Sequence, residues 1–278
     1  MTVEAHAKVN FTLDVCGMRP DGYHALRSVV VPISLSDTIT VEPADALTSD
    51  TGYDDDLCVK AAKVMDPTKG ARISVVKRIP AGGGLGGGSA DAAAVLRALN
   101  EMWGLNLSRT ELAEIGAQVG SDVPALVLGG SVLMEGRGEK VTPLAPTSEH
   151  SNNPNIRTIH LVLVNPGVHS STGEVYAACE ARTKDAPSPT DAMIGALKSG
   201  DLARIAAAAS NDLQPAAVKL HPEIADALTS LRTAGATGVT MTGSGSCVFG
   251  FVPDAATAER LSSELNFRSL QAWPVHTI

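Results

Sequence analysis

Apolar and polar side chains alternate near the start of the chain. One face carries Val3, Ala5, Ala7, Val9, Phe11, Leu13 and Val15, and the other carries His6, Lys8, Asn10, Thr12 and Asp14. A period of two over this length predicts a half-buried strand over residues 3–15. Lys8 and Asn10 lie on its polar face, where they are free to meet solvent or a ligand.

Similar patterns predict both strands and helices along the rest of the chain. Strands are expected at residues 29–33, 38–41, 72–79, 158–164, 238–242, 247–252 and 271–275, and a hairpin over 131–144. Helices are expected at residues 57–64, 89–103, 190–197, 201–209, 221–234 and 255–265. Ser108 with Glu111 and Ser171 with Glu174 match the capping box S-x-x-E, and each predicts a helix start. The first of these two helices is expected to stop at Gly120. The fold class is therefore α+β.

Length and composition indicate two domains. A chain of 278 residues is near the size at which a single core stops growing. Residues 145–157 are rich in Pro, Ser and Asn, so we expect domains over residues 1–150 and 158–278. Only 3% of the residues are aromatic, so the core must consist mainly of Ala, Val, Leu and Ile.

Charge and cysteine content restrict the possible partners. The net charge of −8 argues against a nucleic-acid partner, and any phosphate must be bound by local backbone N–H groups and a few basic side chains. The four cysteines are far apart and form no CxxC pair, which favours reduced thiols over a zinc site or a disulfide framework. Glu4 interrupts any signal peptide, and no apolar run is long enough to cross a bilayer. We therefore expect a cytoplasmic protein without a membrane partner.

A glycine-rich loop lies between a predicted strand and a predicted helix. It consists of Pro80, Ala81, Gly82, Gly83, Gly84, Leu85, Gly86, Gly87, Gly88, Ser89 and Ala90. The loop contains G-x-G-x-x-G, but no second strand with an acidic end follows, as dinucleotide binding requires. A Walker A loop is excluded because the chain has no Gly-Lys, and the protein-kinase signatures His-Arg-Asp and Asp-Phe-Gly are also absent. Six glycines before a helix N-terminus favour a phosphate site made of backbone amides, although a tight turn remains the alternative.

The loop, together with other stretches, resembles the GHMP small-molecule kinases. The matching stretches are Ala7-Lys-Val-Asn, Asp21-Gly-Tyr-His, the glycine loop, Gly120-Ser-Asp-Val-Pro, Asn211-Asp-Leu and Thr242-Gly-Ser-Gly-Ser. The resemblance implies an N-terminal domain like domain 2 of ribosomal protein S5 and a ferredoxin-like C-terminal domain. It implies ATP as phosphate donor, with Mg²⁺ arriving with ATP. The implied acceptor is the 2-hydroxyl of a cytidine diphosphate-linked alcohol of the non-mevalonate isoprenoid route.

The resemblance also implies roles for individual residues. Lys8 would contact the acceptor hydroxyl and the transferring phosphate, and Asp122 would be the general base. The alternatives are a solvated lysine and a helix N-cap ahead of Val123-Pro124.

Substrate contacts are implied for Asn10, Tyr23, His24, Thr172 and Tyr176, with Tyr23, His24 and Tyr176 lining a cytosine pocket. Gly243, Ser244 and Gly245 form a second glycine loop that is expected near the phosphates. Ser89 either helps to place Mg²⁺ or caps the following helix. Family members commonly carry Asn where this chain has Asp56, which puts any hydrogen bond donated by that amide in doubt.

Two other functions stay open at this point. One is a GHMP kinase that acts on a sugar or an amino alcohol. The other is a ligand sensor of the same fold without catalytic activity, although such a protein would be expected to lose Lys8 or Asp122.

Overall fold

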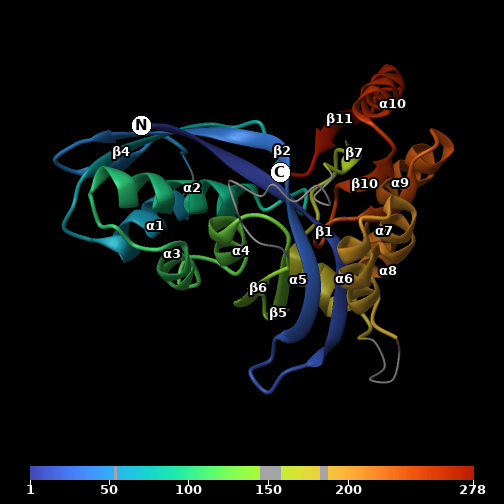
Figure 1. Ribbon diagram of the computed structural model, residues 1–278, viewed down its shortest axis with the longest axis horizontal. Coiled ribbons are helices and arrows are strands. Elements are labelled where there is room, and N and C mark those ends of the chain that lie inside the picture. Colours follow the sequence, from blue (N-terminus) through green and yellow to red (C-terminus); the bar gives the residue numbers. More distant parts are fainter. Residues whose placement is uncertain (53–54, 145–157, 182–186) are drawn as a thin grey trace.

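The computed structural model describes residues 1–52, 55–144, 158–181 and 187–278, which form an α+β molecule with two sheets (Figure 1). The larger sheet has the strand order β3-β4-β2-β1-β8, with β5 paired to β2 and β6 to β5. Its strands are β1 Thr2–Met18, β2 His24–Pro43, β3 Leu47–Ser49, β4 Ala71–Val76, β5 Val132–Gly136, β6 Lys140–Pro143 and β8 Ser210–Asn211.

Two long strands, β1 and β2, form a hairpin that runs from one side of the molecule to its centre and there bends downward (Figure 1). The strand structure expected at 29–33 and 38–41 is confirmed, but the expected break between them is wrong, because β2 is continuous. Asp37 lies in the middle of β2 with a fully buried side chain. Its carboxylate accepts the N–H groups of Arg78 and Ile79, so it joins β2 to the residues after β4 and does not mark a turn.

The polar face of β1 is also covered. Lys8, Asn10, Thr12 and Asp14 are all buried, so the expectation of a half-buried strand is wrong for this stretch. The C-terminal half supplies the cover, since the Thr12 hydroxyl bonds that of Thr190 at 2.8 Å. The sequence pattern shows which residues share a face, but it does not show what a distant segment places on that face.

Four helices pack below the larger sheet (Figure 1). They are α1 Leu57–Met65, α2 Gly87–Met102, α3 Arg109–Gly116 and α4 Val123–Leu128. The apolar face expected for α2 is confirmed, because Val95, Leu96 and Leu99 are fully buried in the core with Phe11 of β1. The Ser108 capping box is confirmed, but its helix ends at Gly116 and not at Gly120.

The smaller sheet has the order β11-β7-β10-β9, with all neighbours antiparallel. Numbered along the chain this is 4-1-3-2, the order of a ferredoxin-like split βαβ unit. Its strands are β7 His160–Asn165, β9 Thr237–Met241, β10 Val248–Val252 and β11 Gln271–His276, and its packed helices are α9 Glu223–Thr233 and α10 Ala255–Phe267.

Among the described residues, four short helices lie between β7 and α9. They are α5 Thr172–Ala178, α6 Pro189–Ser199, α7 Leu202–Ala208 and α8 Gln214–Leu220. Ser171 precedes α5 without a side-chain cap, so the expected second capping box is wrong although the helix is present. The sequence analysis missed α8 and the two-residue strand β8, which are too short to show a period.

The two halves of the chain are joined by strand pairing. β8 belongs to the C-terminal half but pairs in parallel with β1, and Thr277 bridges to Ile33 of β2. The expected boundary at 145–157 lies outside the described residues, and the division into 1–150 and 158–278 stays a prediction. In the part of the chain that the structure describes, no helix is long and apolar enough to cross a membrane.

Candidate active site

A cavity of about 1170 Å³ brings together most of the residues singled out from the sequence. Of those residues, it is lined by Lys8, Asn10, Tyr23, His24, Gly82, Gly84, Gly86, Gly87, Gly88, Ser89, Asp122, Thr172, Tyr176, Ser244 and Gly245. Six other predicted site residues, all described, are outside this lining: Pro80, Ala81, Gly83, Leu85, Ala90 and Gly243.

The first glycine loop wraps around the start of α2. Gly82, Gly84 and Gly86 have φ values of 67°, 72° and 68°, which side chains rarely tolerate. α2 begins at Gly87, two residues before the expected start, with Gly86 as its N-cap. Ser89 is therefore not the N-cap, and its hydroxyl is left for another role.

The first amides of α2 are available to a ligand. The N–H groups of the first helical residues have no partner within a helix, and the first intrahelical bond here runs from Ala90 N–H to Gly86 C=O at 2.8 Å. Among the described residues, no acceptor is bonded by the N–H of Gly87, Gly88 or Ser89. Gly87, Gly88 and Ser89 line the cavity at the positive end of the helix dipole, an arrangement that can bind an anion.

The second glycine loop, residues 242–246, packs against the first. Ser246 N–H donates to Gly82 C=O at 3.3 Å and Cys247 N–H to Gly83 C=O at 3.1 Å. Gly83 is in close contact with Cys247, since a Cβ on Gly83 would lie 2.6 Å from its sulfur. Gly83 and the buried Leu85 therefore hold the two loops together and are not exposed to a ligand.

Lys8 is held at the junction of the two loops. Its ammonium donates to Asn10 Oδ1 at 2.7 Å and lies 3.5 Å from Asp122 Oδ2. Its backbone N–H donates to Leu85 C=O at 3.0 Å. Only 5% of the Lys8 side chain is exposed, which excludes the alternative of a solvated surface lysine.

Asn10 is engaged by the protein itself. Its Oδ1 accepts from Lys8 Nζ, from the Thr242 hydroxyl at 3.3 Å and from Gly243 N–H at 3.0 Å. Its Nδ2 donates to the Ser28 hydroxyl at 2.7 Å. Asn10 thus connects Lys8 to the second loop, and one Nδ2 hydrogen at most remains for a substrate.

Asp122 occupies the N-cap position of α4, but its side chain makes no capping hydrogen bond. The carboxylate turns instead towards Lys8 and is 27% exposed within the cavity. The geometry therefore favours a reactive carboxylate over a simple helix cap.

Three aromatic side chains, Tyr23, His24 and Tyr176, also line the cavity. The rings of His24 and Tyr176 are 5.5 Å apart between centroids and tilted by 33°. Burial raises the pKa of the Tyr176 phenol, and the charge of Asp122 adds to this effect. Tyr23 is 59% exposed, and the Arg137 guanidinium lies 5.0 Å from its ring centre. Thr172 reaches the second loop, where its hydroxyl bonds that of Ser244 at 2.8 Å.

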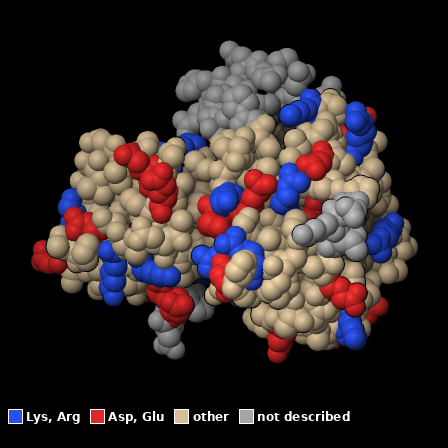
Figure 2. All heavy atoms as spheres, turned by 90° about the horizontal axis from the view of Figure 1, so that it is seen from below, with Lys and Arg blue, Asp and Glu red and all other residues tan. Residues whose placement is uncertain are grey.

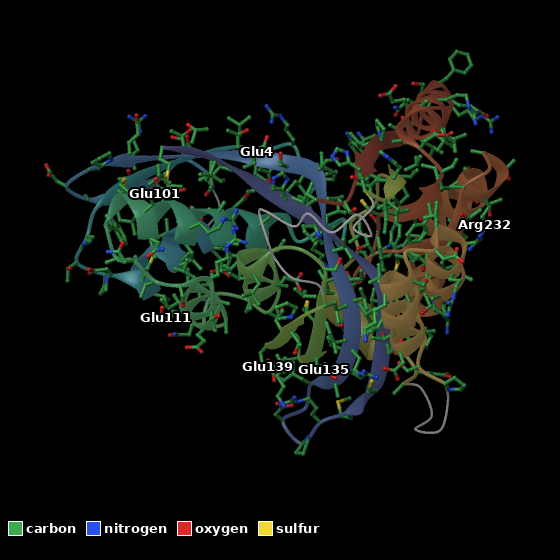
Figure 3. The ribbon with its side chains drawn as sticks, viewed as in Figure 1. Glu4, Glu101, Glu111, Glu135, Glu139 and Arg232 are labelled. Atoms are coloured by element: carbon green, nitrogen blue, oxygen red, sulfur yellow. The ribbon has the colours of Figure 1, made fainter. Side chains whose placement is uncertain are left out.

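Charged residues near the cavity form ion pairs and not a single basic patch. Glu139, at the β5–β6 turn, and Glu135, on β5, lie beside the β1–β2 hairpin (Figure 3). Glu139 Oε1 lies 3.6 Å from Arg19 Nη1, and Glu135 Oε1 lies 3.1 Å from Arg27 Nε. Acidic and basic side chains are interspersed over the face of the molecule in Figure 2. Any phosphate bound here would therefore depend mainly on local amides, as expected from the net charge of −8.

The sequence analysis missed a buried charge cluster behind the glycine loop. Lys77 bonds Asp37 at 2.5 Å and Asp91 at 2.7 Å, and its ammonium lies 3.5 Å from where a Cβ on Gly87 would be. Burial raises the pKa of Asp91 to about 7, against the opposing effect of Lys77. The only signal in the sequence was a lysine three residues before the loop and an acid just after it.

The Asp56 carboxylate is engaged by the protein itself. Its Oδ1 caps α1 through Cys58 N–H at 2.7 Å, and its Oδ2 accepts the Thr51 hydroxyl at 2.6 Å. Burial opposes ionisation of Asp56, but hydrogen bonds from Ser49, Thr51 and the α1 amides lower its pKa on balance. Asp56 borders a second cavity of about 540 Å³ next to α1.

Comparison with known proteins assigns the family. The model of the GHMP kinases N terminal domain matches residues 56–130, and that of the GHMP kinases C terminal matches residues 193–269. The chain is 40% identical to the 4-diphosphocytidyl-2-C-methyl-D-erythritol kinase of Symbiobacterium thermophilum, over the full length of both. The chain belongs to the GHMP kinase family. The α+β GHMP kinase fold is thereby confirmed.

Other GHMP kinases agree with this assignment. The 4-diphosphocytidyl-2-C-methyl-D-erythritol kinase of Pelotomaculum thermopropionicum is 41% identical over 95% of this chain and 93% of its own. A crystal structure of 4-(cytidine 5'-diphospho)-2C-methyl-D-erythritol kinase superposes with a TM-score of 0.84 at 34% identity, covering 100% of this chain and 99% of the other. A mevalonate kinase superposes with a TM-score of 0.71 at 16% identity, which shows the shared fold alone.

Proposed function

We propose that this GHMP kinase transfers the γ-phosphate of ATP to the 2-hydroxyl of 4-diphosphocytidyl-2-C-methyl-D-erythritol, in the non-mevalonate route to isoprenoid precursors. The observation that carries the proposal is the arrangement within one cavity. One cavity is lined by Lys8 and Asp122, 3.5 Å apart, by the residues that carry the free amides of α2, and by the His24–Tyr176 ring pair.

The proposal assigns each group of cavity residues to one of the two substrates. The amides of Gly87, Gly88 and Ser89 hold ATP phosphates, and the second loop with Ser244 and Gly245 approaches them from the other side. His24 and Tyr176 stack on the cytosine, with Tyr23 at the rim. In this proposal, the Thr172 hydroxyl and the remaining Nδ2 hydrogen of Asn10 form hydrogen bonds with the substrate.

In the chemical step, Asp122 Oδ2 accepts the proton of the substrate hydroxyl, whose oxygen forms a bond to the γ-phosphorus while ADP leaves. The Lys8 ammonium stabilises the negative charge on the transferring phosphoryl oxygens and keeps the hydroxyl close to the carboxylate. Phosphoryl transfer depends mainly on positioning and charge stabilisation, so holding Lys8 rigidly through Asn10 matters as much as the base itself.

Mg²⁺ would arrive with ATP and neutralise charge on its phosphate oxygens. The Ser89 hydroxyl offers one oxygen ligand of the kind that Mg²⁺ prefers, because Ser89 lines the cavity and does not cap α2. Ser89 is thus the side chain proposed to help hold it. The expected cytoplasmic location stays a prediction from the sequence.

One assay tests the proposal. Purified protein is incubated with Mg-ATP and 4-diphosphocytidyl-2-C-methyl-D-erythritol, and separately with mevalonate and with galactose, while ADP release is measured. We expect turnover with the diphosphocytidyl alcohol alone. Turnover with mevalonate or galactose instead would identify another GHMP kinase, and no turnover with any acceptor would favour a ligand sensor.

A further inference from the structure

Asn211 lies outside the cavity, yet it holds the loop that borders the Lys8 ammonium. Its Nδ2 donates to Met241 C=O at 2.9 Å and to Gly243 C=O at 2.8 Å, and its Oδ1 accepts Leu213 N–H at 2.9 Å. The side chain is 8% exposed, so these bonds are shielded from water. A single amide thus fixes the carbonyls on both sides of Thr242.

The two carbonyls determine how the second glycine loop faces the site. With Gly243 C=O turned to Asn211, the Gly243 N–H points to Asn10 Oδ1, the atom that also accepts Lys8 Nζ. Gly243 has φ of 56°, and a Cβ on it would lie 3.3 Å from Lys8 Nζ. A small rotation of this loop would therefore move the acceptor that holds the ammonium.

Asn211 is itself fixed to the strand that carries Lys8 and Asn10. In the β1–β8 pair, Asn211 lies opposite Leu13, and the next residue, Asp212, donates its N–H to Leu13 C=O at 2.9 Å. Asp212 Oδ2 also accepts Val15 N–H at 2.9 Å. Asn211, the last residue of β8, and Asp212, which follows it, thus fix the second loop relative to the strand that carries Lys8.

We propose that Asn211 is a positioning residue for phosphoryl transfer: it fixes the second glycine loop relative to Lys8 and thereby sets the geometry of the ammonium at the γ-phosphate. This inference rests on the proposed function. It assigns a role to the Asn211-Asp-Leu stretch, for which the sequence implied none. Since Asn211 touches neither ligand, its loss should lower kcat and leave both KM values nearly unchanged.

The test compares Asn211→Ala with a matched variant far from the site. Asn266 uses its amide in the same way, bonding both the C=O and the N–H of Ala272 at the α10–β11 connection. We expect Asn211→Ala to lower kcat about 10²-fold, because misplacing a catalytic group by about 1 Å has that effect. Both KM values should stay within about threefold. Asn266→Ala should lower the melting temperature but keep the parental kcat.

Several outcomes would overturn the inference. These are an unchanged kcat in folded Asn211→Ala, an equal fall of kcat in Asn266→Ala, or a large rise in the ATP KM. Asn211→Ser, which keeps one donor, serves if Asn211→Ala does not fold, and we expect an intermediate kcat. If Asn211→Ser does not fold either, Asn211 supports the fold and not the loop, and the inference fails. A parent protein that does not phosphorylate the diphosphocytidyl alcohol refutes the proposed function first, and the inference falls with it.

Discussion

At the scale of single residues, burial and hydrogen bonding distinguish the proposed site residues from solvated side chains and simple helix caps. Lys8 and Asn10 come from the polar side of a strand that sequence pattern assigns to solvent, yet both are less than 5% exposed. Asp122 has the position of a helix cap without performing that task. A buried ammonium facing a carboxylate that caps nothing is costly to maintain, and the proposed phosphoryl transfer explains why both are kept.

Asp122→Asn tests the base directly. The amide preserves the shape of the side chain but cannot accept the hydroxyl proton, so we expect kcat to fall about 10²-fold or more. ATP affinity should be little changed, since the phosphates are held by the α2 amides. Steady-state kinetics and calorimetry with a non-hydrolysable ATP analogue measure the two effects. Asp254→Asn, at the distant cap of α10, is the control, and full activity of Asp122→Asn would refute the role.

Asp91→Asn tests the buried cluster through the pH dependence of stability. Burial raises the pKa of Asp91 from its ordinary value of 3.8 to about 7 in the folded protein. The folded state therefore binds more protons than the unfolded state between about pH 4 and pH 7, and this contribution to stability is lost as the pH rises through that window. Asp91→Asn removes the effect.

The free energy of unfolding of Asp91→Asn, relative to the parent, should therefore increase on the order of 1–3 kcal/mol from pH 5 to pH 8. Urea unfolding at both pH values measures this change. Asp91→Asn also removes one ion-pair partner of Lys77, which lowers stability at both pH values but does not alter the sign of the change between them. The exposed Asp45→Asn should give no such change, and a pH-independent difference for Asp91→Asn would contradict the assigned ionisation.

At the scale of elements, the sequence predicts what is encoded locally. The glycine loop, α2, the Ser108 capping box and all four strands of the small sheet follow from period, caps and turn residues. The continuity of β2 does not, because it depends on Asp37 meeting the amides of Arg78 and Ile79. The anchoring roles of Asn10 and Asn211 also depend on partners more than 25 residues away, which no local pattern contains.

Gly86→Ala tests the close approach of the loop to Lys8. Gly86 has φ of 68°, and an added Cβ would lie 3.2 Å from Lys8 Cε and 3.4 Å from Asp122 Oδ2. We expect a loss of about 1–2 kcal/mol from the left-handed backbone, together with at least a tenfold lower kcat. Gly104→Ala is a matched control, because its φ is 65° with nothing within 4 Å of the added Cβ. If both variants lose stability and neither loses activity, Gly86 serves only the turn.

At the scale of the whole molecule, the cavity exists only because the two halves of the chain are packed together. Three of the four phenylalanines meet at this junction, where the Phe11 ring of β1 lies 5.0 Å from Phe251 and 5.9 Å from Phe249 of β10. The hairpin β1–β2 supplies Lys8 and His24, while the C-terminal half supplies Tyr176 and the second loop. A substrate that contacts both His24 and Tyr176 would therefore meet both halves at once.

The aromatic pair gives a prediction at this scale. Stacking on an aromatic side chain contributes about 1–3 kcal/mol per base, so His24→Ala and Tyr176→Ala should each raise the KM of the diphosphocytidyl alcohol about tenfold or more. The KM of ATP should stay close to that of the parent. If one cytosine contacts both rings, as proposed, the double variant should lose less binding energy than the two single variants added together. Phe267→Ala, at a fully solvated ring on α10, is the control. Strict additivity, or an equal rise in the KM of ATP, would mean that the two rings stabilise the fold and do not hold a common base.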